Sequence, residues 1–289
     1  MSSLVLVLLM QYVVYTKAGY VNHVEGAVNV KATDNVPAGA PIKTGSGGFA
    51  EILLNPGSYL RLGENSEAVL DGIELTHIAL RLVSGSGVIE AVRFSKKSPL
   101  HVKSGNLEVD IVKDGIYKFS DGQAFVVTGG LQTPGNKIVF KKGWQVSNGA
   151  GFQALKVKTS PTPLEFWSRN RSKAIAEANM SIVRSLRGTS ALNSLTADSW
   201  LWVPTLGAFT FMPVYGFRSP YGYSYTSVTD TNYVNGSSGY PNRAGNGTIE
   251  GLSGGGGGGG AGGGGVPIQS EATPREVDRG SPSGGHLPP

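Results

Sequence analysis

A turn between two short alternating segments constrains this chain more than any other feature. Residues 48–70 read GFAEILLNPGSYLRLGENSEAVL, with apolar positions alternating on both sides of Asn55-Pro56-Gly57-Ser58. Proline fixes φ where such a turn begins, and glycine accepts the positive φ that the next position needs. The stretch therefore predicts a β-hairpin, with Ala50, Ile52 and Leu54 on one face of its first strand.

The same alternation continues through the first half of the chain. The predicted strands span residues 21–30, 50–54, 59–62, 78–83, 87–92, 107–112, 116–119, 123–128, 137–140 and 144–146. The turn signals between them are Asp71-Gly72, Ser84-Gly85, Ser104-Gly105, Asp114-Gly115, Asp121-Gly122 and Pro134-Gly135. Closely spaced short strands with such turns predict an all-β domain over residues 19–160.

A weak echo recurs within this domain at a spacing of about 22 residues. Residues 57–62 (GSYLRL) are followed by 80–85 (LRLVSG) and by 103–109 (KSGNLEV). Successive coils of a β-solenoid would produce this repeat, and a meandering β-sandwich would produce it too. Both architectures are consistent with the sequence.

The N-terminal segment is the most apolar part of the chain. Ser2–Tyr15 reads SSLVLVLLMQYVVY, which is shorter than the roughly 20 residues of a membrane-spanning helix. Its length suits the apolar region of a signal peptide, and Thr16-Lys17-Ala18 places small residues around a cleavage after Ala18. Residues 1–18 are therefore predicted to be a signal peptide. Because no Lys or Arg precedes the apolar run, a first β-strand is the alternative.

A helix is predicted after the β domain, over residues 164–188. A stripe along one side of it is formed by Trp167, Arg171, Ala174, Ala178, Ile182 and Leu186. Gly188 follows as a C-cap. We expect this helix to pack on its own β domain.

An aromatic-rich segment follows at residues 199–225. Trp200 and Trp202 alternate, as do Phe209 and Phe211, so a hairpin would place the four rings on one face. Such a face is a candidate binding surface for polysaccharide or an apolar partner. The alternative is a strand pair that buries its rings against the helix or the β domain. Residues 226–289, rich in glycine and proline, are predicted to be a disordered tail.

The order of motifs in the β domain resembles the FecR domain. The residues that carry the resemblance are Thr44, Gly45, Ala50, Gly57, Ser58, Leu60, Leu62, Asn65 and Ser66, followed by LVSGSGV at 82–88. The resemblance covers residues 24–146. The aromatic segment is similar to one that follows FecR-like domains of the acidobacterial type.

The resemblance implies an extracytoplasmic, β-rich module. The best-known FecR proteins receive a signal from an outer-membrane transporter and pass it through the inner membrane to a sigma factor. We expect this chain to lack the cytoplasmic and membrane-spanning parts of that route. The resemblance therefore favours an exported interaction, scaffold or sensing module that contacts a protein or the cell envelope. A sigma-regulator component that works through a partner is a further alternative.

Catalytic and metal chemistry find little support in the sequence. The chain contains no cysteine, which excludes thiol catalysis and thiolate metal sites. His23, His77 and His101 are not spaced as metal ligands, and the net charge of +5 is not clustered as in nucleic-acid-binding proteins. A carboxylate pair drawn from Glu51, Glu90, Glu108 and Asp110 is the one hydrolase hypothesis. We expect these acids to be solvent-facing strand residues, and we expect no enzyme activity, cofactor or bound nucleic acid.

Overall fold

The structure is a computed structural model that describes residues 13–14, 17–135, 138–189, 192, 195–227 and 229. Almost all of the predicted tail and most of the predicted signal peptide lie outside these residues. Within the apolar N-terminal segment, Val13–Val14 forms β1, which pairs with β15 (Ser199–Val203). The backbone N–H of Ala18 donates to the carbonyl of Ile73 at 2.8 Å.

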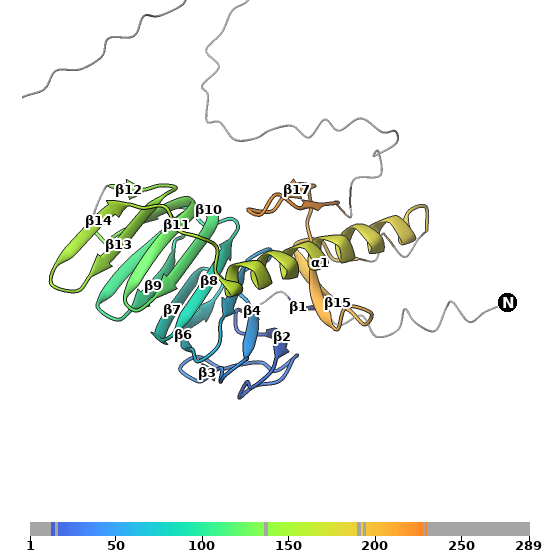
Figure 1. The fold of residues 1–289 in the computed structure, drawn as a ribbon. Coiled ribbons are helices and arrows are strands. Elements are labelled where there is room, and N and C mark those ends of the chain that lie inside the picture. The colour runs from blue at the N-terminus through green and yellow to red at the C-terminus, as the bar shows by residue number, and fades with distance from the viewer. Residues whose placement is uncertain are drawn as a thin grey trace, which may run out of the picture. The chain divides into compact units, whose positions relative to one another are not determined.

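The described chain consists of eighteen strands and one long helix, α1 (Figure 1). The strands of the first part are β2 (Val21–Glu25), β3 (Pro41–Lys43), β4 (Phe49–Leu53), β5 (Tyr59–Leu62), β6 (Glu67–Glu74), β7 (His77–Ser84), β8 (Ser86–Ala91), β9 (Leu100–Ser104), β10 (Leu107–Ser120), β11 (Gln123–Gln132), β12 (Val139–Phe140), β13 (Trp144–Asn148) and β14 (Phe152–Lys156). After α1 (Pro163–Leu186) come β15, β16 (Ala208–Met212), β17 (Phe217–Arg218) and β18 (Ser224–Tyr225). The prediction of a mainly β chain with one helix is confirmed.

Strands β2–β14 form one 13-stranded sheet, with the order β2-β4-β5-β8-β10-β9-β7-β6-β3 along its main path. The sheet curls so that one face encloses an apolar core, which contains Ala50, Ile52, Leu54, Leu60 and Leu62 as the hairpin pattern predicts. Strands β3, β6, β9 and β14 were not predicted. Their apolar residues are fewer or interrupted, so alternation alone does not mark them.

Strand β10 joins the two layers of the curled sheet, which are β2-β4-β5-β8 on one side of it and β9-β7-β6-β3 on the other. Its first half pairs with β9, its second half, from Gly115 onward, pairs with β8, and β11 follows both halves with register shifts between Ile111 and Tyr117. A Cβ atom on Gly115 would lie 2.2 Å from the carbonyl oxygen of Thr128, so only glycine permits this close approach. The expected turn at Asp114-Gly115 is therefore wrong: it is a bend inside a strand. Asp71-Gly72 likewise lies inside β6, at a register shift.

The 22-residue echo corresponds to one parallel pairing. Strands β7 and β9 run parallel, with Ala79 opposite His101 and Leu82 opposite Ser104, an offset of 22 residues. Between them the chain crosses to the other layer as β8, which pairs with β5 and β10. One coil-like step is thus built into a sheet that is otherwise antiparallel.

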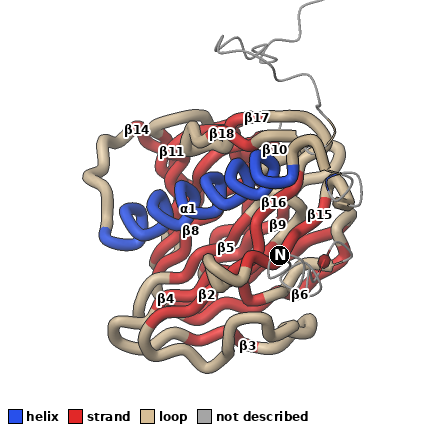
Figure 2. The backbone as a smooth tube through the Cα atoms, turned by 90° about the vertical axis from the view of Figure 1, so that its right-hand side faces the viewer, coloured by secondary structure: helices blue, strands red, loops and turns tan. Residues whose placement is uncertain are grey.

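Helix α1 lies across the outer face of the sheet, over β5 and β8 (Figure 2). It begins with a capping box between Thr162 and Glu165, and Gly188 follows it with φ of +75°. No helix in the described part of the chain is long and apolar enough to cross a membrane.

The buried face of α1 is rotated from the predicted stripe. Its buried residues are Leu164, Ser168, Arg171, Ser172, Ile175, Ala176, Asn179 and Val183. Of the predicted stripe only Arg171 belongs to this set, and the others lie half-buried at its margin. The predicted face is therefore wrong, because the centre of the true interface is polar and a hydrophobic pattern cannot mark it.

Candidate functional site

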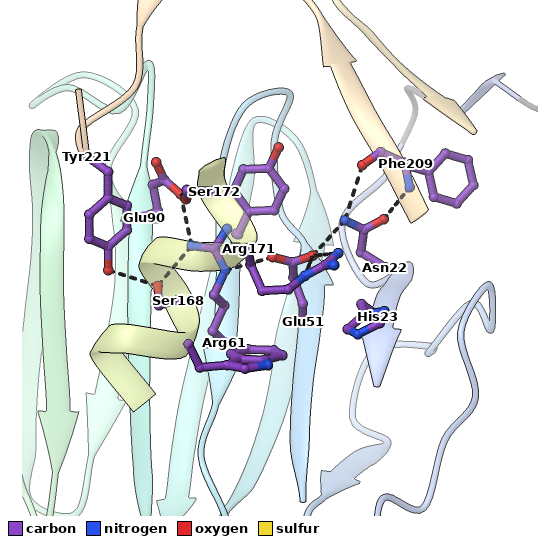
Figure 3. A network of polar contacts seen from close by, with 12 residues as sticks. Asn22, His23, Glu51, Arg61, Glu90, Ser168, Arg171, Ser172, Phe209 and Tyr221 are labelled. Atoms are coloured by element: carbon purple, nitrogen blue, oxygen red, sulfur yellow. Dashed lines mark hydrogen bonds and ion pairs between the residues drawn. The ribbon is translucent and has the colours of Figure 1, made fainter. Parts of the chain in front are cut away.

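Four charged side chains are buried together where α1 crosses the sheet (Figure 3). Glu51 comes from β4, Arg61 from β5, Glu90 from β8 and Arg171 from α1, and none is more than 8% exposed. They lie on the strand faces opposite the apolar core, so these strands are buried on both sides. Two acids and two bases make the cluster neutral, as burial of charge requires.

Arg61 lies at the centre of the cluster. Its Nε donates to Glu51 Oε2 at 2.7 Å, and its Nη1 donates to Glu90 Oε2 at 2.9 Å and to Ser168 Oγ at 3.0 Å. The guanidinium carbon lies 4.6 Å from the centroid of the Tyr59 ring, within cation–π range. One side chain therefore joins β4, β5, β8 and α1.

Glu51 is the acceptor that ties α1 to β4. Its Oε1 accepts from Arg171 Nη2 at 2.8 Å and from Asn22 Nδ2 at 2.8 Å. Burial alone would raise the pKa of this carboxyl, but the charges of Arg61 and Arg171 outweigh burial and lower the pKa to about 2. Burial would likewise lower the pKa of Arg61, whereas Glu51 and Glu90 raise it above its ordinary value. Glu51 and Arg61 therefore stay charged, and their ion pair persists, across the physiological pH range.

Hydroxyl groups complete the cluster and bind the last hairpin, β17–β18. Ser172 Oγ donates to Glu90 Oε2, Tyr221 donates to Ser168 Oγ at 2.8 Å, and the Tyr59 and Tyr225 hydroxyls lie 3.4 Å apart. Burial raises the pKa of Tyr221 to about 12, although the charge of Arg61 lowers it. These phenols are neutral donors at physiological pH.

Two asparagine side chains cover the outer edge of β16. Asn22 Oδ1 accepts from the backbone N–H of Phe209 at 2.6 Å, and its Nδ2 donates to the Phe209 carbonyl at 3.3 Å. Asn179 donates to the carbonyls of Phe211 and Thr226 and accepts from the N–H of Thr226. Each amide thus replaces part of a missing strand. These contacts join the helix, the hairpin and the sheet into one body. The ion pairs and hydrogen bonds of the cluster hold the three in one fixed arrangement.

We expect Asn179→Ala to lower the free energy of unfolding by about 1–3 kcal/mol, because it leaves buried backbone groups of β16 and residue 226 without partners. Asn170, exposed on the same helix, gives the matched control Asn170→Ala, with a change within about 0.5 kcal/mol. Urea denaturation followed by circular dichroism measures both. Equal effects of the two substitutions would contradict the role assigned to Asn179.

The four predicted rings share one face of the β15–β16 hairpin, as Trp200 pairs with Phe211 and Trp202 with Phe209. Trp200, Phe209 and Phe211 are at most 1% exposed, and they pack against Tyr59, Leu53 and Ile175. Trp202 alone is half-buried. The hairpin is folded against the sheet and α1, which is the alternative of buried rings that the sequence left open.

The expectation of solvent-facing acids is wrong for Glu51 and Glu90, which are buried around Arg61. Glu108 pairs with Lys103 at the surface, and Asp110 Oδ1 lies 2.7 Å from His101 Nδ1. Glu51 and Glu90 thus share Arg61, while Glu108 and Asp110 are each paired with a different basic group on other strands. Among the described residues no group of three or more His, Asp or Glu side chains could hold a metal ion.

The residues that carry the FecR resemblance serve the turns of the sheet. Thr44 Oγ1 accepts from the N–H of Ser66, and Ser66 Oγ accepts from the N–H of Ser86, both at 2.9 Å. Ser58 Oγ accepts from the N–H of Val92 at 2.8 Å and donates to its carbonyl. The remaining members are Gly45, Ala50, Gly57, Leu60, Leu62 and Asn65, of which Gly57 and Asn65 adopt positive φ and Ala50, Leu60 and Leu62 lie in the core. The residues of the motif therefore shape the turns and the core of the sheet.

Residues 40–129 match the family model described as FecR protein, which confirms the predicted resemblance over β3 to most of β11. Among solved structures the chain is similar to two crystal structures of a candidate anti-sigma factor from Parabacteroides distasonis ATCC 8503. The first is 13% identical with a TM-score of 0.36 and covers 45% of this chain and 65% of its own. The second is 15% identical with a TM-score of 0.36 and covers 51% and 73%. The chain spans about two thirds of the length of these structures. A comparison with curated proteins found no match.

Proposed function

We propose that this chain is a non-catalytic, FecR-like regulatory module that acts through protein contacts outside the cytoplasm. The observation that carries the proposal is the FecR match over residues 40–129, which falls on the sheet that supports α1. FecR-type modules take part in signalling across the cell envelope, and a regulatory role follows from that likeness.

The buried cluster supports a particular mode of action. The four charged residues of the cluster fix α1 on the sheet. The sheet, α1 and the strands that follow α1 therefore present one rigid surface. A partner protein would bind to that fixed surface. Binding or release of the partner would then transmit the signal. A glycan-binding role receives less support, since three of its four candidate rings are buried.

Deletion of the gene in the native host tests the regulatory role. We expect a defined set of transcripts to change and to return to its original level when the intact gene is restored on a plasmid. RNA sequencing measures the transcript levels. If the FecR-type route operates through a partner, the changed transcripts would include genes transcribed with an alternative sigma factor. An unchanged transcript profile, in cells shown to produce the protein, would overturn the proposal.

The proposed location is tested separately by fractionation of the native host and N-terminal sequencing of the purified chain. An exported chain that begins at Gly19 would agree with the signal-peptide prediction. A cytoplasmic chain that retains Val13–Val14, which pair with β15, would overturn the proposed location and favour the first-strand alternative.

A further inference from the structure

Strand β14 forms an edge of the sheet, at the end away from β15 (Figure 1). The N–H of Val157 donates to the carbonyl of Gly143, so hydrogen-bonded pairs with β13 recur at Leu155 and Gln153. The N–H and C=O groups of Phe152, Ala154 and Lys156 therefore point away from β13. Within the described residues no hydrogen bond to these groups is found.

Two other edges of the molecule, those of β16 and β3, are covered by asparagine side chains. Asn22 and Asn179 bind the outer edge of β16, as described above. Asn29 does the same for β3: its Oδ1 accepts from the N–H of Lys43 at 2.7 Å and its Nδ2 donates to the carbonyl of Pro41 at 3.0 Å. An uncovered edge invites a further strand, and β14 lacks the protection that these edges have.

The side chains of β14 are unusually apolar for an edge. Phe152 is 46% exposed and Leu155 is 51% exposed, and the Phe152 ring lies 5.7 Å from the ring of Phe140. The segment 152–156 reads FQALK and contains no proline and no acid. Lys156 is the one charged residue in it, so its position decides which strands can pair with this edge.

We propose that β14 is the pairing edge for a second copy of this chain, in an antiparallel arrangement centred on Ala154. In this register Ala154 faces the partner's Ala154, and Phe152 faces the partner's Lys156. The outward N–H and C=O groups of Phe152, Ala154 and Lys156 all find partners, and the two-fold axis makes the contact self-complementary. No two lysines are opposed, because each Lys156 extends over an aromatic ring.

The contact is short, so the dimer is a weak one that forms at roughly 100 µM chain. Sedimentation velocity of the full chain from about 5 µM to about 1 mM would show a concentration-dependent shift from monomer to dimer. A chain that stays monomeric throughout this range would overturn the proposal.

Two substitutions at one exposed position test the register. Phe152→Lys and Phe152→Glu remove the same ring, but the first opposes the partner's Lys156 with a like charge and the second with an opposite one. Because the two-fold axis creates the pair twice, we expect Phe152→Glu to dimerise at least about ten-fold more tightly than Phe152→Lys. Equal affinities of the two variants would contradict pairing through this edge.

Ala154→Pro tests the backbone contact. Proline removes an N–H that points away from β13, so the monomer keeps its own sheet while the dimer loses its central bonds. We expect at least a ten-fold loss of affinity and faster amide exchange of residues 152–156 at high chain concentration. Phe166→Ser, which removes an exposed ring on α1, is the control and should leave the dimer unchanged. A dimer that is weakened by Phe166→Ser and not by Ala154→Pro would place the contact elsewhere.

Discussion

Replacing Arg61 with alanine lowers the free energy of unfolding by about 3–5 kcal/mol, which is the largest effect we expect from any single substitution in this chain. The reason is that Glu90 is left buried without the guanidinium that it binds, while Glu51 loses one of its two and keeps only Arg171. Urea denaturation of the full chain, followed by tryptophan fluorescence, measures the loss. Trp200 is the tryptophan that reports on the cluster, since its ring packs edge-on against Tyr59 beside it.

Arg81→Ala is the matched control. Arg81 binds Asp71 at 2.8 Å, but both side chains are at least 40% exposed, so their ion pair contributes about 0–1 kcal/mol. A loss of less than about 1 kcal/mol on Arg61→Ala would mean that water enters the cluster and screens it. The cluster would then not hold α1 on the sheet.

Replacement of the whole cluster asks what its charges contribute. A quadruple variant removes all four charges together, so none is left unpaired. Its substitutions are Glu51→Leu, Arg61→Met, Glu90→Leu and Arg171→Met. Buried ion networks exchanged for apolar residues in this way often keep or gain stability. The specific role of the charges is then to fix one register of α1, which alternative apolar packings would not select.

The sequence predicts the sheet better than it predicts the site. The turn at Asn55–Ser58 can be predicted because proline fixes φ and glycine accepts a positive φ. The N–H of Ser58 indeed donates to the carbonyl of Asn55 at 2.8 Å. Alternation places Ala50 and Ile52 in the core for the same local reason. Such signals depend on neighbouring residues only, so one sequence suffices to find them.

The buried cluster depends on elements far apart in the chain. Arg171 and Glu51 are in contact although they are 120 positions apart in the sequence. No local pattern shows that a helix covers the outer face of the strands. A signal exists in retrospect: Leu53 and Tyr59 make the second face of the hairpin apolar too, which indicates burial on both sides. The isolated charges at Glu51 and Arg61 then require partners from another element.

The bend in β10 differs from the predicted turn for a related reason. Asp114-Gly115 has the composition of a tight turn, but the glycine is needed for the close approach of Thr128 in the adjacent strand. Composition identifies the need for a small residue and does not identify its cause. The same ambiguity applies to Asp71-Gly72 in β6.

Acid weakens the fold through Glu51, and this is the second large effect that we expect. The folded-state pKa of about 2 lies below the ordinary value of 4.5, so the folded chain binds this proton less readily than the unfolded chain. The stabilising contribution is therefore fully present above the unfolded pKa and is lost as the pH falls toward 2. The shift corresponds to a contribution on the order of 3 kcal/mol, most of which is removed by pH 2.

Unfolding free energies of the intact chain and of Glu51→Gln, measured by urea denaturation from pH 7 to pH 2, isolate this contribution. The variant should begin less stable, because Arg61 and Arg171 lose their anion, and should then show a flatter acid dependence. Glu177→Gln serves as the control: Glu177 is 57% exposed and lies 3.8 Å from Lys173, so its removal should leave the acid profile of the intact chain. Parallel acid profiles for Glu51→Gln and the intact chain would show that Glu51 is protonated equally in both states. The ion pair with Arg171 would then not be what fastens α1 to the sheet.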